Sequence, residues 1–188
     1  MSFNLSVIPN KNIILAVTGG IAAYKSAIVV RRLKDAGFDV RVVMTAGAQA
    51  FITPLTFQAL SGNPVHTELL NPEAEAGMGH IELARWADLL LVAPASCDTL
   101  AKFAAGLADD LLSTLYLASK CPVWVAPAMN QQMWAAKATQ RNLNTLVDDG
   151  VHVIMPDAGS QACGDVGLGR MPEPEDLAQQ VTQYFHQA

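Results

Sequence analysis

The sequence predicts an α/β fold, a Rossmann-like doubly wound parallel sheet in a three-layer sandwich. Two observations lead to this prediction. Short runs that are almost continuously apolar alternate with longer segments of helical periodicity, and such runs are typical of strands buried on both faces of a parallel sheet. Right-handed crossovers between parallel strands then place helices on both sides of the sheet.

The predicted elements follow one another without a repeat or a linker, so residues 1–188 are expected to form a single domain. Strands are predicted at residues 13–18, 40–44, 65–69, 89–93, 123–126 and 151–155. Helices are predicted at residues 21–36, 46–60, 80–86, 99–119, 131–148 and 174–185. Residues 156–172 are rich in glycine and lack apolar periodicity. They predict a long loop of the kind that often serves as a lid or a binding loop.

The composition argues against several classes of function. A net charge of −5 and a pI near 5.2 leave no basic footprint for nucleic acid. No apolar stretch approaches the about 18 to 20 residues that a membrane-spanning helix needs, and the first residues lack the basic and apolar regions of a secretory signal. Three cysteines without repeating spacing fit the reducing cytoplasm better than a disulfide framework.

The first predicted strand ends in a turn that could hold a phosphate. Thr18, Gly19 and Gly20 lead directly into a helix, and small residues there let backbone N–H groups approach an anion at the positive end of the helix. A tight turn with nothing bound is the alternative. The dinucleotide fingerprint Gly-x-Gly-x-x-Gly is absent, and the second strand ends without an acidic residue, since Asp39 lies at its start. The pattern therefore favours a mononucleotide or another phosphate over NAD.

Two further strand ends carry polar side chains. Ser96, Asp98 and Thr99 follow the fourth strand, and Asn130 follows the fifth. Each could be an ordinary helix cap, but ligands of open α/β sheets bind beyond the carboxyl ends of the strands, so three such turns together predict a site. His80 opens a helical stretch, where a structural role is the alternative. No spacing of His, Cys, Asp and Glu resembles a metal site, and none is predicted.

Cys163 lies within the glycine-rich stretch, in the run Ala162-Cys163-Gly164-Asp165. A thiol on a loop of this kind can close over a ligand and exchange a proton. An unreactive loop cysteine is the equally weighted alternative from the residues alone.

Four motifs stand out when the chain is taken as a whole. They are Pro-x-Met-Asn-x-x-Met-Trp at 127–134, Pro-Ala-Ser-Cys-Asp-Thr at 94–99, Gly-His-Ile at 79–81, and the cysteine stretch that ends in Gly-Leu-Gly-Arg-Met at 167–171. Together they resemble the family of flavin-containing cysteine decarboxylases, and within it the phosphopantothenoylcysteine decarboxylases of coenzyme A biosynthesis. Asp98 stands where some of these relatives carry Asn.

The resemblance implies FMN as the cofactor. The FMN phosphate would sit on the turn formed by Gly19, Gly20 and Ile21. The rest of the cofactor would contact Thr45, Ser96, Asp98, Thr99 and Ala128.

The resemblance also implies the reaction, which is decarboxylation of 4'-phosphopantothenoylcysteine to 4'-phosphopantetheine by transient thiol oxidation, loss of CO2 and re-reduction of the enethiol. His80 would lie beside the flavin and the substrate thiol. Asn130 would bind the substrate carboxylate, with Met129 also contacting the substrate, and Cys163 would protonate the intermediate. Homotrimers, often assembled into dodecamers with the site shared between subunits, are implied as well.

Three alternatives accompany this interpretation. A peptidyl-cysteine decarboxylase stops at the enethiol and differs in the cysteine stretch, so the intact Ala162-Cys163-Gly164-Asp165 favours the full reaction. A flavin prenyltransferase lacks the 127–134 motif. A non-catalytic flavin-binding regulatory subunit is the alternative from a different class. The sequence does not distinguish a monofunctional protein from a piece of a bifunctional decarboxylase–synthetase.

Overall fold

The computed structural model describes residues 11–69 and 79–187, and its centre is a six-stranded sheet in the order β3-β2-β1-β4-β5-β6. Every neighbouring pair in this sheet is parallel. The strands are β1 (Asn12–Val17), β2 (Asp39–Met44), β3 (Val65–His66), β4 (Leu89–Ala95), β5 (Val123–Pro127) and β6 (His152–Val153). The predicted doubly wound, Rossmann-like sheet is confirmed.

Alternation along the central strands builds two cores. In β1, Ile13 and Leu15 face one hydrophobic cluster, whereas Ile14 and Ala16 face the other. Side chains of a strand point alternately to opposite faces of the sheet, so a run that is apolar at every position fills the space beneath both helix layers. All seven residues of β4 are buried for the same reason.

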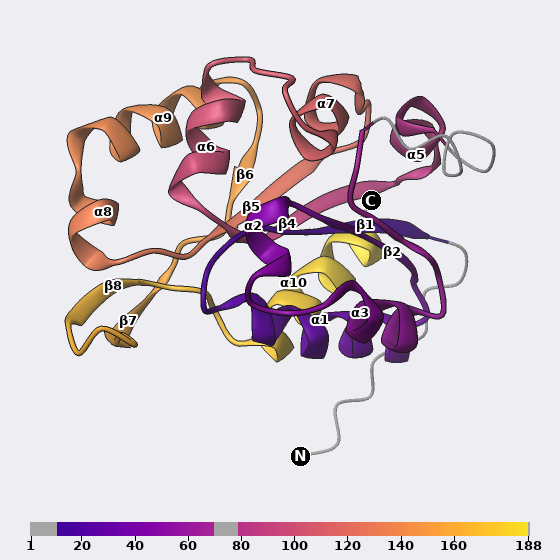
Figure 1. Ribbon diagram of the computed structural model, residues 1–188, viewed down its shortest axis with the longest axis horizontal. Helices are drawn as coiled ribbons and strands as arrows, with labels where there is room; N and C mark the ends of the chain where they lie inside the picture. The colour runs from indigo at the N-terminus through magenta and orange to yellow at the C-terminus, as the bar shows by residue number, and fades with distance from the viewer. Residues whose placement is uncertain (1–10, 70–78, 188) are drawn as a thin grey trace.

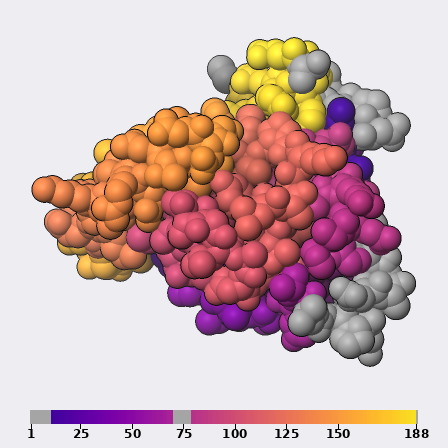
Figure 2. Space-filling view, turned by 90° about the horizontal axis from the view of Figure 1, so that it is seen from above, coloured from indigo at the N-terminus to yellow at the C-terminus, as the bar shows by residue number. Residues whose placement is uncertain are grey.

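Helices cover both faces of the sheet (Figure 1). One layer contains α1 (Ala23–Asp35), α3 (Pro54–Ser61) and α10 (Pro174–Gln187). The other contains α5 (His80–Trp86), α6 (Cys97–Ala104), α7 (Leu111–Ala118) and α9 (Lys137–Asp148). Figure 2 shows this second layer from outside, with α9, α6, α7 and α5 packed side by side. Two short helices, α2 (Ala46–Gln49) and α8 (Gln131–Ala135), follow the ends of β2 and β5.

Three of the predicted helices are each two helices in the structure. The predicted 46–60 helix breaks before Pro54, which lacks a backbone N–H and occupies the first turn of α3. The predicted 99–119 helix breaks at Gly106, which has φ +67°, and Asp110 then caps α7. The predicted 131–148 helix breaks at the extended Ala136 between α8 and α9. Helical periodicity continued across these breaks because both halves pack on the same face of the sheet.

The prediction of a structureless loop at 156–172 was wrong. Most of this stretch is an antiparallel hairpin, β7 (Asp157–Ser160) and β8 (Val166–Arg170), which projects with α8 from one end of the sheet (Figure 1). Its glycines break the apolar alternation on which strand prediction depends. The outer strands β3 and β6 are shorter than predicted, with two residues each. Among the described residues, no helix is long and apolar enough to cross a membrane.

Candidate active site

The sheet reverses its winding between β1 and β4, and their carboxyl ends are joined by a buried hydroxyl. The Thr18 Oγ1 donates to the Pro94 carbonyl at 2.7 Å and accepts from the Ser96 N–H at 2.9 Å. One helical turn into α1, the buried Ser26 Oγ donates to the Ala93 carbonyl at 2.6 Å. These bonds set the position of the turn after β4 relative to the turn after β1. The place is the one at which open α/β sheets bind ligands. Sequence reasoning gave Thr18 no role of its own.

The turn after β1 has the shape of an anion site. Within the described residues, the N–H groups of Gly19, Gly20 and Ile21 donate to no protein acceptor, and the turn leads into the 13-residue helix α1. A Cβ added to Gly20 would have no atom within 4 Å, so there is open space beside the turn. Free N–H groups, the amino end of a helix and open space are what a phosphate requires.

Gly19 is required for a different reason from Gly20. A Cβ at Gly19 would lie 3.0 Å from the backbone carbon of Gly47 in α2. The turns after β1 and β2 therefore approach each other backbone to backbone, and a side chain would force them apart. This contact brings Thr45, the N-cap of α2, to the same edge of the sheet.

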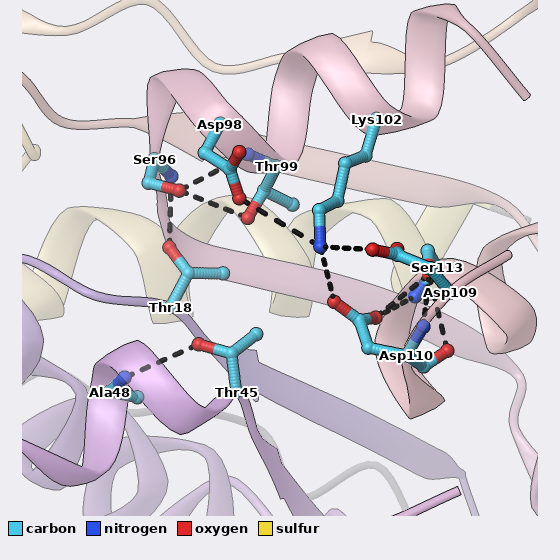
Figure 3. A network of polar contacts seen from close by, with 10 residues as sticks. All are labelled: Thr18, Thr45, Ala48, Ser96, Asp98, Thr99, Lys102, Asp109, Asp110 and Ser113. Carbon is cyan, nitrogen blue, oxygen red and sulfur yellow. Dashed lines mark hydrogen bonds and ion pairs between the residues drawn. The ribbon is translucent and has the colours of Figure 1, made fainter. Parts of the chain in front are cut away.

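The predicted residues Thr45 and Ser96 also cap helices, and Thr99 lies in the first turn of the helix that Ser96 caps (Figure 3). Thr45 accepts from the Ala48 N–H at 3.3 Å, and Ser96 accepts from the Thr99 N–H at 3.2 Å. The Ser96 and Thr99 hydroxyls lie 3.0 Å apart. The capping role that the sequence left as an alternative is therefore present. A hydroxyl keeps further hydrogen-bonding capacity while it caps, so the two roles are compatible.

Asp98 is largely exposed and lies 4.0 Å from the Lys102 Nζ. Lys102 also pairs with Asp109 and Asp110 at 3.0 Å each, which ties α6 to the start of α7 (Figure 3). Hydrogen bonds to Asp110 and Asp109 raise the pKa of Lys102. Burial opposes ionisation of Asp110, but hydrogen bonds from Ser113 and Lys102 outweigh it and lower the pKa of Asp110. Sequence reasoning did not find Lys102.

A second group forms where the hairpin meets α8. Asn130 caps α8 through its Oδ1, which accepts from the Gln132 N–H at 2.8 Å. The Asn130 Nδ2 donates to the Asp165 Oδ2 at 2.8 Å and to the Cys163 Sγ at 3.3 Å. Two residues predicted separately, Asn130 and Cys163, are thus in contact. Cys163 is exposed at the tip of the hairpin.

Gln161 holds the hairpin against the start of α8, and sequence reasoning missed it. Its Nε2 donates to the carbonyls of Met129 and Leu168 at 3.1 and 3.3 Å, and its Oε1 accepts from the Gln131 N–H at 3.0 Å. The Met129 N–H donates to the Gly169 carbonyl at 2.9 Å. A Cβ at Gly169 would lie 2.1 Å from the Met129 carbonyl oxygen, so only glycine allows this approach. A glutamine in a glycine-rich stretch, such as Gln161, does not indicate from the sequence that its side chain anchors a hairpin.

The two groups are neighbours along the sheet. The Ala128 N–H donates to the Ala95 carbonyl at 3.1 Å, which joins the turn that leads to Asn130 to the turn that begins with Ser96. The turn residues around Gly19 and Ser96 and the Asn130–Cys163 group are therefore at the carboxyl ends of β1, β4 and β5, which are adjacent strands.

His80 does not join them within one copy of the chain. It is half-buried at the start of α5, and α5 lies far across the molecule from β7 and β8 (Figure 1). The described residues contain no group of three or more His, Cys, Asp or Glu that could hold a metal ion.

Comparison with known proteins adds the family. The Flavoprotein family model matches residues 3–186. The coenzyme A biosynthesis bifunctional protein CoaBC of Escherichia coli (strain K12) is 57% identical over 175 residues, which are 93% of this chain and 43% of that protein. The chain thus spans less than half the length of curated relatives such as this one.

Two solved structures share the fold over nearly their whole length. One is a cysteine-to-serine mutant of PPC decarboxylase complexed with pantothenoylaminoethenethiol, with a TM-score of 0.83 and 33% identity over 94% of this chain and 99% of that one. The other is the FMN binding protein AtHal3, with a TM-score of 0.80 and 34% identity over 95% and 98%. With the family match over residues 3–186, these findings establish that the chain belongs to the flavoprotein family.

Proposed function

We propose that this chain is an FMN-dependent decarboxylase that converts 4'-phosphopantothenoylcysteine to 4'-phosphopantetheine in coenzyme A biosynthesis. The observation that carries the proposal is the contact between Asn130 and Cys163 next to the strand-end turns. In the roles proposed here, Asn130 is a neutral donor for the substrate carboxylate and Cys163 beside it is the proton donor. The similarity to CoaBC and to PPC decarboxylase supports the same activity.

The FMN site is proposed at the carboxyl ends of β1, β2, β4 and β5. The free N–H groups of Gly19, Gly20 and Ile21 fit the phosphate, and the open space beside Gly20 leaves room for it. The rest of the cofactor is assigned to Thr45, Ser96, Asp98, Thr99 and Ala128. When bound, FMN supplies a two-electron acceptor that the substrate thiol can reduce and that can return the hydride later.

Asn130 is assigned to the substrate carboxylate, with Met129 beside it. An amide can donate two N–H bonds to a carboxylate without adding a buried charge. Decarboxylation destroys the negative charge of the carboxylate, so a cationic partner would stabilise the ground state more than the transition state and slow the loss of CO2. A neutral donor avoids that effect.

Cys163 is assigned to the final proton transfer. Its thiol lies at the tip of the hairpin, next to the Asn130 amide that is assigned to the oxygens of the substrate carboxylate. When Cys163 protonates the enethiolate carbon, its own sulfur is left with a negative charge. The Asn130 N–H that points at the Cys163 sulfur stabilises that charge.

His80 is assigned to the same chemistry from a second copy of the chain, because in one copy α5, which His80 begins, lies far from the β7–β8 hairpin that carries Cys163 (Figure 1). We therefore propose a homotrimer, four copies of which assemble into a dodecamer. The protein is proposed to be cytoplasmic. An exposed apolar stripe along α1 and the turn before it supplies a surface that a second copy could cover; it consists of Ile21, Tyr24 and Ile28.

The test is to purify the protein with FMN, add phosphopantothenoylcysteine, and follow CO2 release and product mass. We expect a yellow protein that makes phosphopantetheine. A protein that cannot be reconstituted with FMN would overturn the proposal. Release of the enethiol as the final product would indicate the peptidyl-cysteine type of reaction, and bound flavin without turnover would indicate a regulatory subunit.

A further inference from the structure

The side-chain amide of Asn130 has no donor to spare in this structure. One N–H points to the Asp165 carboxylate at 2.8 Å and the other to the Cys163 sulfur at 3.3 Å. The Oδ1 is occupied by the Gln132 N–H as the cap of α8. A substrate carboxylate that binds to this amide must therefore displace a group that is already there.

The group in place is itself a carboxylate. Asp165 binds Asn130 at the short distance of a charge-assisted hydrogen bond, as the substrate carboxylate would. The second donor of the amide is held by the weaker sulfur acceptor. An incoming carboxylate thus meets a competitor of its own chemistry at its own binding group.

The tip of the hairpin can release Asn130 while its base stays docked. The hairpin outside the Ala162–Asp165 tip is held by the side chain of Gln161 and by the Met129–Gly169 backbone bond. The tip is a turn closed by two backbone bonds, from the Gln161 N–H to the Asp165 carbonyl and from the Gly164 N–H to the Gln161 carbonyl. Gly164 has φ +92° in this turn, and because glycine adopts positive and negative φ about equally readily, the turn can change its conformation here at little cost.

We infer that Asp165 occupies the carboxylate subsite of Asn130 as an internal substitute, and that substrate binding exchanges one carboxylate for the other. This inference rests on the proposed function, because it takes the substrate carboxylate to bind at Asn130. Asp165 is then a specificity-determining residue. It lowers the affinity for every ligand that brings a carboxylate to Asn130 and leaves ligands without one unaffected.

The exchange also orders the reaction. Cys163 and Asp165 dock on the same amide, so a substrate carboxylate on Asn130 displaces the tip and with it the thiol. When CO2 has left, the amide is vacant, Asp165 returns to it, and Cys163 returns with Asp165. The proton donor is thereby in place only after the carboxylate has gone, and it meets the enethiolate and not the substrate.

The experiment compares two ligands that differ only in the carboxylate. They are 4'-phosphopantothenoylserine and its decarboxylated counterpart, 4'-phosphopantothenoyl-ethanolamine. Neither has a thiol for the flavin to oxidise, so calorimetry on the FMN-loaded protein measures binding alone. The variants are Asp165→Asn, which keeps the size of the side chain and removes the charge, and Asp157→Asn, which makes the same change at the base of the same hairpin.

Asp165→Asn should bind the serine ligand roughly five-fold more tightly, because a charge-assisted hydrogen bond is about twice as strong as a neutral one. Its affinity for the ethanolamine ligand should stay within about two-fold, and Asp157→Asn should change neither. An equal effect of Asp165→Asn on both ligands, or no effect on either, would overturn the inference.

A second background separates competition for the amide from simple charge repulsion. Asn130→Gly removes the amide at little cost to the cap, since glycine is tolerated at that position. In the Asn130→Gly background, adding Asp165→Asn should change the affinity for the serine ligand by no more than about two-fold relative to its effect on the ethanolamine ligand. A preference that persists there would show that Asp165 acts by repulsion and would overturn the exchange. If the wild-type protein binds neither ligand, the proposed function itself fails.

Discussion

The amide nitrogen of Asn130 lies 3.3 Å from the sulfur of Cys163, although 33 residues separate them along the chain. Asn130 caps the helix that follows β5, and Cys163 comes from a hairpin that folds back onto that helix. The proposed carboxylate-binding group and the proposed proton donor are therefore built into one unit. Four predictions follow from the geometry around this unit and around the strand-end turns.

Replacing Cys163 with serine should separate the two halves of the reaction. Thiol oxidation and CO2 release should persist, while the oxidised enethiol accumulates and phosphopantetheine formation falls by at least about 100-fold, the usual contribution of a general acid. Product mass measured against CO2 release checks this. Cys121→Ser is the control, because Cys121 lies at the start of β5, away from the hairpin. Unchanged phosphopantetheine output in Cys163→Ser would remove this thiol from the mechanism.

Alanine at Gly19 should lower the stability of the apoprotein, whereas alanine at Gly20 should lower the affinity for FMN. Gly19→Ala places a Cβ against the Gly47 backbone and should lower the melting temperature of the apoprotein. Gly20→Ala meets no protein atom, so the apoprotein should keep its stability. Its FMN affinity should drop by about 10-fold or more, because the new methyl group fills the space proposed for the phosphate and hydrogen bonds to charged groups contribute about 1.5 to 3 kcal/mol.

Thermal unfolding of the apoproteins and FMN titration followed by absorbance separate the two effects. If Gly20→Ala binds FMN as tightly as the wild-type protein, the phosphate does not sit on this turn.

His80 and Asn130 should act from different copies of the chain. His80→Asn and Asn130→Asp should each be inactive alone. Mixed trimers made by co-expressing the two variants should regain about a third of the wild-type rate, because one of the three sites in each mixed trimer combines both intact residues. The rate of CO2 release from doubly tagged hybrids measures this. Hybrids as inactive as the parents would place both residues in one copy.

Asp110 should make the free energy of unfolding depend on pH in the acidic range. Its pKa is lowered in the folded state, so it stabilises the fold above the ordinary pKa of about 3.9 for aspartate, and this contribution is lost as the pH falls through the lower folded value. Asp110→Asn should therefore cost about 1 kcal/mol of unfolding free energy at pH 7, a figure discounted for partial exposure. The difference from the wild-type protein should shrink below pH of about 4.

Urea unfolding of the apoproteins at several pH values measures the Asp110 effect. Asp98→Asn is the matched control, because its exposed carboxylate lies 4.0 Å from the same Lys102 and should contribute less than about 0.5 kcal/mol. A pH-independent difference between Asp110→Asn and the wild-type protein would mean that the Lys102 pair does not stabilise the charged form.

The sequence predicted the inner strands well because burial on both faces leaves a run that is apolar at every position, as in β4. The edge strands β3 and β6 are short and partly exposed, so their pattern is weaker and their predicted lengths were wrong. The hairpin β7–β8 escaped prediction for a related reason. Its glycines make room for close contacts, at Gly169 with the backbone of Met129 and at Gly159 with the side chain of Arg170, and such positions leave no apolar period.

By itself, the sequence determined the parallel sheet, the glycine turn after β1, the polar turns after β4 and β5, and the presence of a cysteine in a glycine-rich stretch. These follow from local chemistry, in which burial, turn geometry and capping act within a few residues. Only the tertiary structure decided that Asp165 and Cys163 share the amide of Asn130. The same is true of the Thr18 link between β1 and β4 and of the separation of α5 from the hairpin. Those relationships join segments far apart in the chain, and packing alone sets which side chains meet.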